Sequence, residues 1–244
     1  RQRQMCIRDR SVGSRLQDFT TGSNTLISCE MISINVQNHD VVKHKSISLL
    51  GDAKVSVKLI LERINNFHIS KQYETEINRL KNLWEADVVR VTSKSDKNSL
   101  PSDSEVIGAV NRNVPKDTIV IGAAGSMPGE LHKLWKSGDV EGYHMEYGFS
   151  CMGYEIPAAI GVNLAEPDRP NVIFVGDGSY MMMNSELSTA VMMGISTTII
   201  VTDNRGFGCI NRLQKSTGSE PFNNLFKDSH HQKLPNIDLL SLIH

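Results

Sequence analysis

The sequence predicts an α/β protein with a doubly wound, mostly parallel sheet. Short apolar runs alternate with amphipathic segments in the second half of the chain, and the clearest unit joins a strand at 171–175, a helix at 185–193 and a strand at 197–201. Strand–helix–strand units of this kind are parallel and right-handed in nearly all proteins. A Gly-Asp-Gly turn at 176–178 follows the first strand, at the position where such sheets bind ligands.

The first half of the chain shows the same two periodicities. Residues 32–37 alternate apolar and polar side chains, which predicts a half-buried strand. Apolar residues at helical spacing behind Asp52, a suitable N-cap, predict a helix over 51–66. A second amphipathic helix is predicted over 71–88.

A polar segment at 90–104 is interpreted as a linker. Its small polar and charged residues bury too little apolar area to order the segment. We therefore predict one domain over 11–89 and a second over 105–244. Further elements expected in the second domain are helices at 105–110, 129–135 and 153–161, a strand at 118–122 and a loop over 206–226.

The two ends look unlike folded domain sequence. Residues 1–10 carry four arginines and no periodic pattern, and they resemble translated sequencing-adapter peptides. We expect this segment to be non-native and leave it out of the predicted fold. Residues 234–244 begin like a helix and then stop, so we expect a piece of a longer chain.

The composition excludes several classes of function. The 244 residues include 26 Lys and Arg against 27 Asp and Glu, and this net charge of −1 predicts no binding to nucleic acid or to an anionic membrane. The apolar runs are shorter than the roughly 20 residues of a membrane-spanning helix. Four scattered cysteines without a Cys-x-x-Cys pair favour a reducing compartment. We expect a soluble, cytoplasmic protein.

Two predicted strand ends carry oxygen ligands. Glycines at 176 and 178 let the backbone approach a phosphate, but Asp177 would repel that phosphate unless a cation lay between them. Asn204 follows the next strand, and carboxylate, amide and carbonyl oxygens together suit Mg²⁺. A lone Gly-Asp-Gly is usually only a turn. Here 25 residues lie between Gly178 and Asn204, enough for one helix and one strand to bring both ends together.

This spacing resembles the diphosphate and metal motif of thiamine-diphosphate-dependent enzymes. The resemblance implies that Asp177, the Asn204 side chain and the Gly206 carbonyl bind Mg²⁺, and that Gly178 and Ser179 contact the diphosphate. It also implies a thiamine-diphosphate-binding fold. The implied cofactor-binding residues are Ser150, Met152, Gly176, Asp177, Gly178, Ser179, Asn204 and Gly206.

Residues 146–161 resemble the segment that holds the aminopyrimidine in the acetohydroxyacid synthase branch of these enzymes. The resemblance implies that Met152 forces the cofactor into a V shape, while backbone atoms of Ser150 and Met152 bind the pyrimidine edge. Taken alone, Met152 would be interpreted as a gap-filling core residue. The metal motif favours the cofactor role.

Several further segments resemble the branch that opens a sugar-like ring in inositol breakdown; they are residues 123–131, 143–148, 150–155 and 203–208. This resemblance implies hydrolytic carbon–carbon bond cleavage of a polyhydroxylated cyclic diketone. Residues 50–53 resemble the end of a central domain, so the chain would span its tail, the linker and a truncated cofactor domain. The family's activating glutamate would belong to an absent N-terminal domain of a partner subunit. We therefore expect no catalytic residue in this chain, and a homodimer or higher homo-oligomer.

Two other functions stay open. One is a thiamine enzyme that decarboxylates or ligates 2-keto acids, as acetolactate synthase does. The other is a non-catalytic phosphate- or nucleotide-binding α/β module. His144 and Glu146 could contact substrate or cofactor, although a structural His and a capping Glu are the more common situations.

Overall fold

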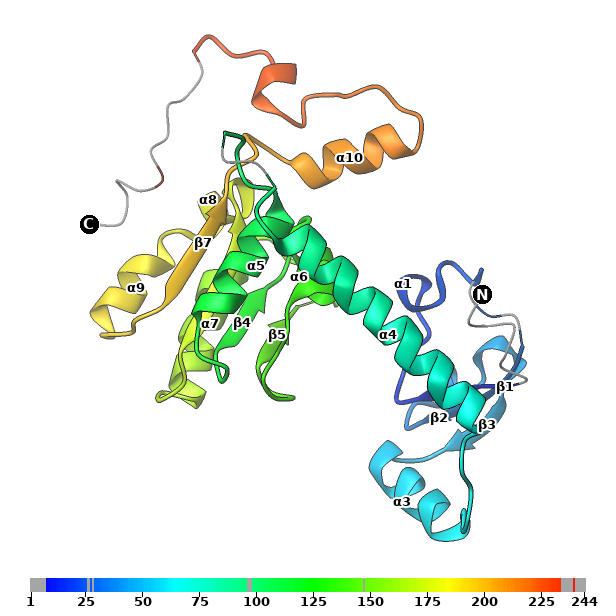
Figure 1. Ribbon diagram of the computed structural model, residues 1–244. Helices are drawn as coiled ribbons and strands as arrows, with labels where there is room; N and C mark the ends of the chain where they lie inside the picture. The colour runs from blue at the N-terminus through cyan, green and yellow to red at the C-terminus, as the bar shows by residue number, and fades with distance from the viewer. Residues whose placement is uncertain are drawn as a thin grey trace. The chain divides into compact units, whose positions relative to one another are not determined.

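The computed structural model describes residues 8–25, 27, 29–95, 98–146, 148–233 and 239. The chain divides into two compact units between Ile77 and Asn78, inside helix α4, Lys71–Thr92 (Figure 1). Each unit contains its own parallel sheet. The predicted α/β class is confirmed.

The first unit contains a three-stranded sheet in the order β1-β2-β3. Its elements are β1 (Arg8–Val12), α1 (Asp18–Thr21), β2 (Glu30–Asn35), α2 (Asn38–Val41), β3 (Ile47–Leu50) and α3 (Ala53–Arg63). The strand predicted at 32–37 is β2, which ends two residues earlier. The Asp52 side chain caps α3 by accepting the Val55 N–H at 2.9 Å, as predicted.

Two predictions in this part of the chain differ from the structure. Residues 8–10, which we left out of the fold, lie in β1 and pair with β2, where Arg10 stands opposite Ile32. The remainder of the excluded segment, 1–7, lies outside the described residues. In the predicted linker, residues 90–92 continue α4, because Val88 and Thr92 are buried in the second unit. The domain boundaries stay a prediction.

The second unit contains a four-stranded parallel sheet in the order β5-β4-β6-β7. Its strands are β4 (Ile119–Gly122), β5 (Tyr143–Met145), β6 (Asn171–Gly176) and β7 (Thr198–Thr202). Its helices are α5 (Asp103–Asn113), α6 (Met127–Leu134), α7 (Glu155–Ala165), α8 (Asp177–Met183), α9 (Glu186–Met192) and α10 (Gly208–Ser216). A short 3₁₀ turn follows at Phe226–Asp228, as one does at Lys43–Lys45 in the first unit.

The second unit is doubly wound, because both faces of its sheet are covered. Val120 in β4 and Phe174 in β6 pack on one face under α5 and α6. Their neighbours Ile121 and Ile173 pack on the opposite face with α7 and Tyr180 of α8. This alternation follows from the period of two along a strand. The two central strands are therefore buried on both sides, as continuous apolar runs predict.

Two local predictions in this unit were wrong. The predicted turn at 176–178 is the start of helix α8, with Gly176 as its extended N-cap and Asp177 as its first residue. A carboxylate is stabilised there by the helix dipole. The predicted loop over 206–226 contains α10, whose residues 208–216 are helical. The helix expected after 234 lies almost wholly outside the described residues.

Helix α5 begins with a capping box. Ser102 accepts the Glu105 N–H, while the Glu105 carboxylate accepts N–H groups from Ser102 at 2.8 Å and Ser95 at 2.7 Å. The N–H of Ser102, then that of Ser95, lowers the pKa of Glu105 from 4.5 to about 2. The carboxylate therefore ties part of the predicted linker to the helix.

This cap makes a testable prediction for pH-dependent stability. Because folding lowers the pKa of Glu105, its contribution is present above pH 4.5 and is lost as the pH falls toward 2. Glu105→Gln should lower the melting temperature at neutral pH, and the gap from wild type should close over that range. Glu166→Gln, at the exposed end of α7, is the control. A gap that is constant with pH would contradict this role.

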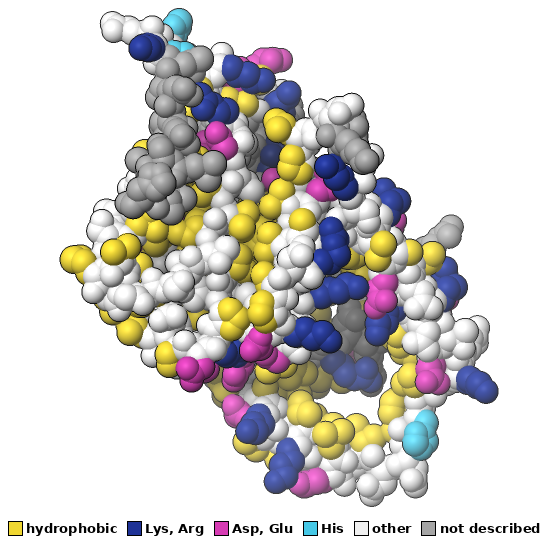
Figure 2. Space-filling model, turned by 60° about the vertical axis from the view of Figure 1, so that its left-hand side comes forward, with side chains coloured by type: hydrophobic (Ala, Val, Ile, Leu, Met, Phe, Trp, Pro, Cys, Tyr) yellow, Lys and Arg dark blue, Asp and Glu magenta, His cyan; other side chains and the backbone are white. Residues whose placement is uncertain are grey.

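The surface carries both signs of charge. Figure 2 shows basic and acidic side chains on the same face, with hydrophobic side chains between them. None of the helices within the described ranges has the length and apolar character needed to cross a membrane.

Candidate functional site

The carboxyl ends of β6 and β7 are neighbours, as the spacing predicted. The two strands pair in parallel with Gly176 opposite Thr202. Asp177 follows β6 directly, and Asn204 follows β7 by two residues. The side chains that were predicted to share an ion therefore start from adjacent points on one edge of the sheet.

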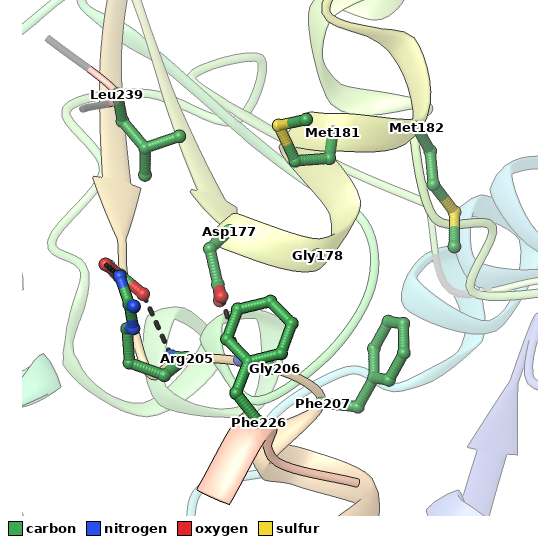
Figure 3. Close-up of a pocket in the computed structure, with 10 residues that line it drawn as sticks. Asp177, Gly178, Met181, Met182, Arg205, Gly206, Phe207, Phe226 and Leu239 are labelled. Carbon is green, nitrogen blue, oxygen red and sulfur yellow. Dashed lines mark hydrogen bonds and ion pairs between the residues drawn. The ribbon is translucent and has the colours of Figure 1, made fainter. Parts of the chain in front are cut away.

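The Asp177 carboxylate turns toward the loop after β7. It accepts the N–H of Gly206 at 2.9 Å (Figure 3) and that of Asn204 at 3.4 Å. The residue is 8% exposed, and this burial raises the pKa of Asp177. The two N–H groups act in the opposite direction, and the nearby Asp203 carboxylate raises the pKa further. A buried carboxylate beside a second carboxylate favours a bound cation.

Asn204 and Gly206 lie at the same tip. The Asn204 side-chain oxygen accepts the N–H of Gly208 at 3.1 Å. Gly206 pairs with Leu225 in an isolated antiparallel bridge, which fixes its position. Amide, carboxylate and carbonyl oxygens each have more than one acceptor site, so these hydrogen bonds leave capacity for a cation. The donor set thus fits a hard divalent ion such as Mg²⁺.

No three His, Cys, Asp or Glu side chains gather into a metal-binding group within the described ranges. The predicted ligand set does not need such a group, because it combines one carboxylate with an amide and a carbonyl. Two of the three predicted metal ligands are therefore the Asn204 side-chain amide and the Gly206 backbone carbonyl.

A cavity of about 300 Å³ opens beside these oxygens. Of the predicted site residues, Asp177, Gly178 and Gly206 line it. The other lining residues, none of which is among the predicted cofactor or metal ligands, are Met181, Met182, Asp203, Arg205, Phe207, Phe226 and Leu239. Figure 3 shows the aromatic rings of Phe207 and Phe226 on the side of the 203–207 loop. The cavity thus has an acidic edge and an apolar wall.

Gly178 lets the side chains of Phe207 and Met152 approach the first turn of α8 closely. A Cβ atom at Gly178 would lie 2.8 Å from Cε1 of Phe207 and 3.5 Å from Cε of Met152. Met152 is half-buried, and this distance places the end of its side chain beside the Gly-Asp-Gly segment. The structure therefore brings Met152, Gly178 and Phe207 together, although they are distant in the sequence.

The Ser179 side chain has structural partners, and its predicted diphosphate contact stays a prediction. Its side chain is 4% exposed and points away from the cavity into a hydrogen-bond network. The hydroxyl accepts the Gly153 N–H at 2.8 Å and donates to both oxygens of Glu155, at 3.0 and 2.8 Å. A diphosphate contact from Ser179 is thus limited to its backbone N–H, which lies in the first turn of α8 and has no partner within the helix.

The segment before Met152 is held locally. The Glu146 carboxylate accepts N–H groups from Phe149 and Cys151, both at 2.8 Å, and these bonds lower its pKa. His144 Nε2 lies 2.8 Å from the Tyr154 hydroxyl, and the two rings stack. Glu146 and His144 therefore have structural partners, which favours the structural interpretation of both.

Two non-glycine residues, one a predicted cofactor-binding residue and the other a residue that lines the cavity, have left-handed backbone. They are Ser150, with φ of 54°, and Arg205, with φ of 60°. The Ser150 hydroxyl donates to the Ala123 carbonyl at 3.3 Å, and the Arg205 guanidinium lies 5.6 Å from the Phe226 ring centre. Such conformations cost energy and concentrate at functional sites.

A doubly wound sheet with carboxylate and amide oxygens beside a helix N-terminus defines an α/β domain suited to a metal-bound diphosphate. The family model described as "Thiamine pyrophosphate enzyme, C-terminal TPP binding domain" matches residues 123–244, half of the chain. The chain belongs to the thiamine pyrophosphate enzyme family, and thiamine diphosphate is the cofactor of that domain.

Several relatives share one name, 3D-(3,5/4)-trihydroxycyclohexane-1,2-dione hydrolase. The protein of Clostridium tetani is 39% identical across 88% of this chain and 38% of its own length. That of Geobacillus thermodenitrificans is 38% identical across 86% and 36%. That of Bacillus cereus is 34% identical across 88% and 38%. The chain thus spans little more than a third of the length of these relatives.

Proposed function

We propose that this chain forms the diphosphate-binding part of an enzyme that uses thiamine diphosphate and Mg²⁺ to hydrolyse a carbon–carbon bond of a cyclic 1,2-diketone. The proposed substrate is trihydroxycyclohexane-1,2-dione and the product 5-deoxy-glucuronate, in myo-inositol breakdown. The names of the relatives support the substrate. One observation supports the metal chemistry: the Asp177 carboxylate reaches the N–H groups of Asn204 and Gly206 on the neighbouring strand tip.

In this proposal each part of the site has one task. Asp177, the Asn204 side-chain oxygen and the Gly206 carbonyl bind Mg²⁺, and the N–H groups of the first turn of α8 bind the diphosphate. When bound, thiamine diphosphate supplies the electron sink for breaking a bond next to a carbonyl. Met152 and Phe207 form an apolar wall beside Gly178 that excludes water from the organic part of the cofactor.

We also propose a cytoplasmic homo-oligomer. The cysteines at 151 and 209 are free thiols, which supports a reducing compartment. Exposed apolar side chains cluster on α8 and α9, where Val191 is 78% and Met192 79% exposed. Apolar clusters of this kind mark contact surfaces more often than free surface. Light scattering on the purified protein should report at least a dimer.

The substrate is tested with a longer protein that contains this chain. It should open the ring of trihydroxycyclohexane-1,2-dione only when thiamine diphosphate and Mg²⁺ are both present, as followed by the appearance of the acid product. The 244-residue chain alone should bind the cofactor weakly and turn over no substrate. Consumption of pyruvate by the longer protein would instead support a 2-keto acid enzyme. Magnesium-independent ligand binding would support a non-catalytic phosphate module.

A further inference from the structure

Glu155 is a wholly buried carboxylate for which the proposed chemistry has no task. It is the first residue of α7 and is 0% exposed. Burying a carboxylate is costly unless hydrogen bonds replace its hydration. Glu and Asp are therefore almost never fully buried without partners. The partners of Glu155 show which parts of the site it connects.

Three separate segments meet at this carboxylate. Oε1 accepts the N–H of Ala124, in the loop after β4, at 3.3 Å. Both oxygens accept the hydroxyl of Ser179, in the first turn of α8, at 3.0 and 2.8 Å. The same hydroxyl accepts the N–H of Gly153 at 2.8 Å. Glu155 thereby joins the segment that contains Met152 to the start of α8.

Packing reinforces the same connection. A Cβ atom at Gly153 would lie 2.6 Å from Cγ of Met183, so the backbone of this segment lies directly against α8. Met152, the preceding residue, has its Cε near Gly178 in the same first turn. The position of Met152 beside Gly178 therefore depends on how Gly153 is held, and Ser179 and Glu155 hold it.

We propose that Glu155 is a positioning residue that fixes the Met152 segment over the first turn of α8 and so shapes the site for the organic part of the cofactor. This inference rests on the proposed function, in which Met152 contacts that part. The metal contacts come from Asp177 and the loop after β7, which Glu155 does not touch through any of these bonds. The proposed diphosphate contacts are backbone N–H groups of α8, whereas Glu155 bonds only the side chain of Ser179 in that helix. Its loss should thus weaken binding of the whole cofactor and spare binding of pyrophosphate.

The test compares two ligands in titration calorimetry on the 244-residue chain with Mg²⁺: thiamine diphosphate and inorganic pyrophosphate. Glu155→Gln keeps the size of the side chain, but its amide nitrogen cannot accept the Ser179 hydroxyl. Affinity for thiamine diphosphate should fall about tenfold, as expected for one lost buried hydrogen bond, and affinity for pyrophosphate should change less than about twofold. Glu166→Gln, at the other end of α7, should change neither affinity.

Hydrogen exchange gives a second readout, and its first measurement uses the wild-type chain. In the wild-type chain the amides of Ala124 and Gly153 should exchange slowly for loop residues, because both donate to this network. Glu155→Gln should speed their exchange while the amides of β6 stay protected. Rapid exchange of both amides in the wild type would overturn the proposal.

The remaining outcomes separate two kinds of failure. Equal losses for both ligands in Glu155→Gln would show a general structural role and overturn the positioning role. No loss for either ligand would overturn it as well. A wild-type chain that does not bind thiamine diphosphate would overturn the proposed function, and this inference with it.

Discussion

Replacing Asp177 with alanine is expected to abolish magnesium-dependent binding of thiamine diphosphate. The predicted ion would lose its carboxylate ligand, and the N–H groups of Asn204 and Gly206 would lose their acceptor. We expect affinity in the presence of Mg²⁺ to fall by about 100-fold or more, because the remaining neutral ligands hold a divalent ion weakly. Titration calorimetry with Mg²⁺ and with a chelator measures the effect.

Asp203→Asn is the matched control for this variant. Asp203 lines the same cavity, and Asp203→Asn also removes one negative charge. Its carboxylate accepts the Arg205 N–H at 2.9 Å and is not a predicted ligand of the ion. The control should retain magnesium dependence with a much smaller loss of affinity. If Asp177→Ala bound the cofactor as well as wild type, or if Mg²⁺ had no effect on wild type, the metal assignment would be refuted.

The sequence could predict this strand edge because parallel strands follow a simple rule. Apolar runs of strand length, separated by one helix, place their carboxyl ends side by side. Asp177 and Asn204 were therefore expected together, and the pairing of Gly176 with Thr202 confirms that their strand ends are adjacent. The core of the second unit could be predicted in the same way, since continuous apolar runs at β4 and β6 indicate strands that are buried on both faces.

The contacts that shape the cavity could not be predicted in this way. Phe226 lines the cavity because the preceding residue, Leu225, pairs with Gly206. Neither Leu225 nor Gly206 lies in a periodic sequence pattern from which this bridge could be predicted. Glu155 lies in the helix predicted at 153–161, and that pattern does not indicate that it bonds to groups more than 20 residues away. Periodicity reports which face of an element is buried, whereas hydrogen bonds between distant segments depend on the finished packing. The one available signal was a charged residue at the start of an apolar, small-residue helix.

Misplaced local elements have a similar cause. Glycines in Gly-Asp-Gly predict a turn from propensity alone, but the strand end and the following helix leave Asp177 as the first residue of α8. Tertiary packing decides such cases because the differences in propensity are below about 1 kcal/mol per residue. Because α8 begins directly at the end of β6, the unpaired N–H groups of its first turn lie closer to the predicted ligand than a separate turn would place them.

Replacing Gly206 with alanine is expected to damage both the loop and the site. Gly206 has φ of 141°, a conformation that side chains disfavour, and a Cβ atom there would lie 2.5 Å from the Asn224 carbonyl oxygen and 3.0 Å from Leu225 Cα. Because both neighbours are backbone atoms, the segment 224–226 would have to move. We expect a loss of about 3 kcal/mol in stability, combining backbone strain with the clash. Binding of thiamine diphosphate should fall with it, since the Gly206 carbonyl would shift.

Gly218→Ala separates strain from close approach. Gly218 also has a positive φ, of 84°, but nothing lies within 4 Å of a Cβ atom there. This control should cost only about 1–2 kcal/mol in denaturant unfolding and leave cofactor affinity unchanged. If Gly206→Ala cost no more than Gly218→Ala and bound the cofactor normally, the bridge between Gly206 and Leu225 would not be what holds the metal loop. A larger cost with lost affinity would instead show that the loop after β7 carries the site only while the segment 224–226 lies against it.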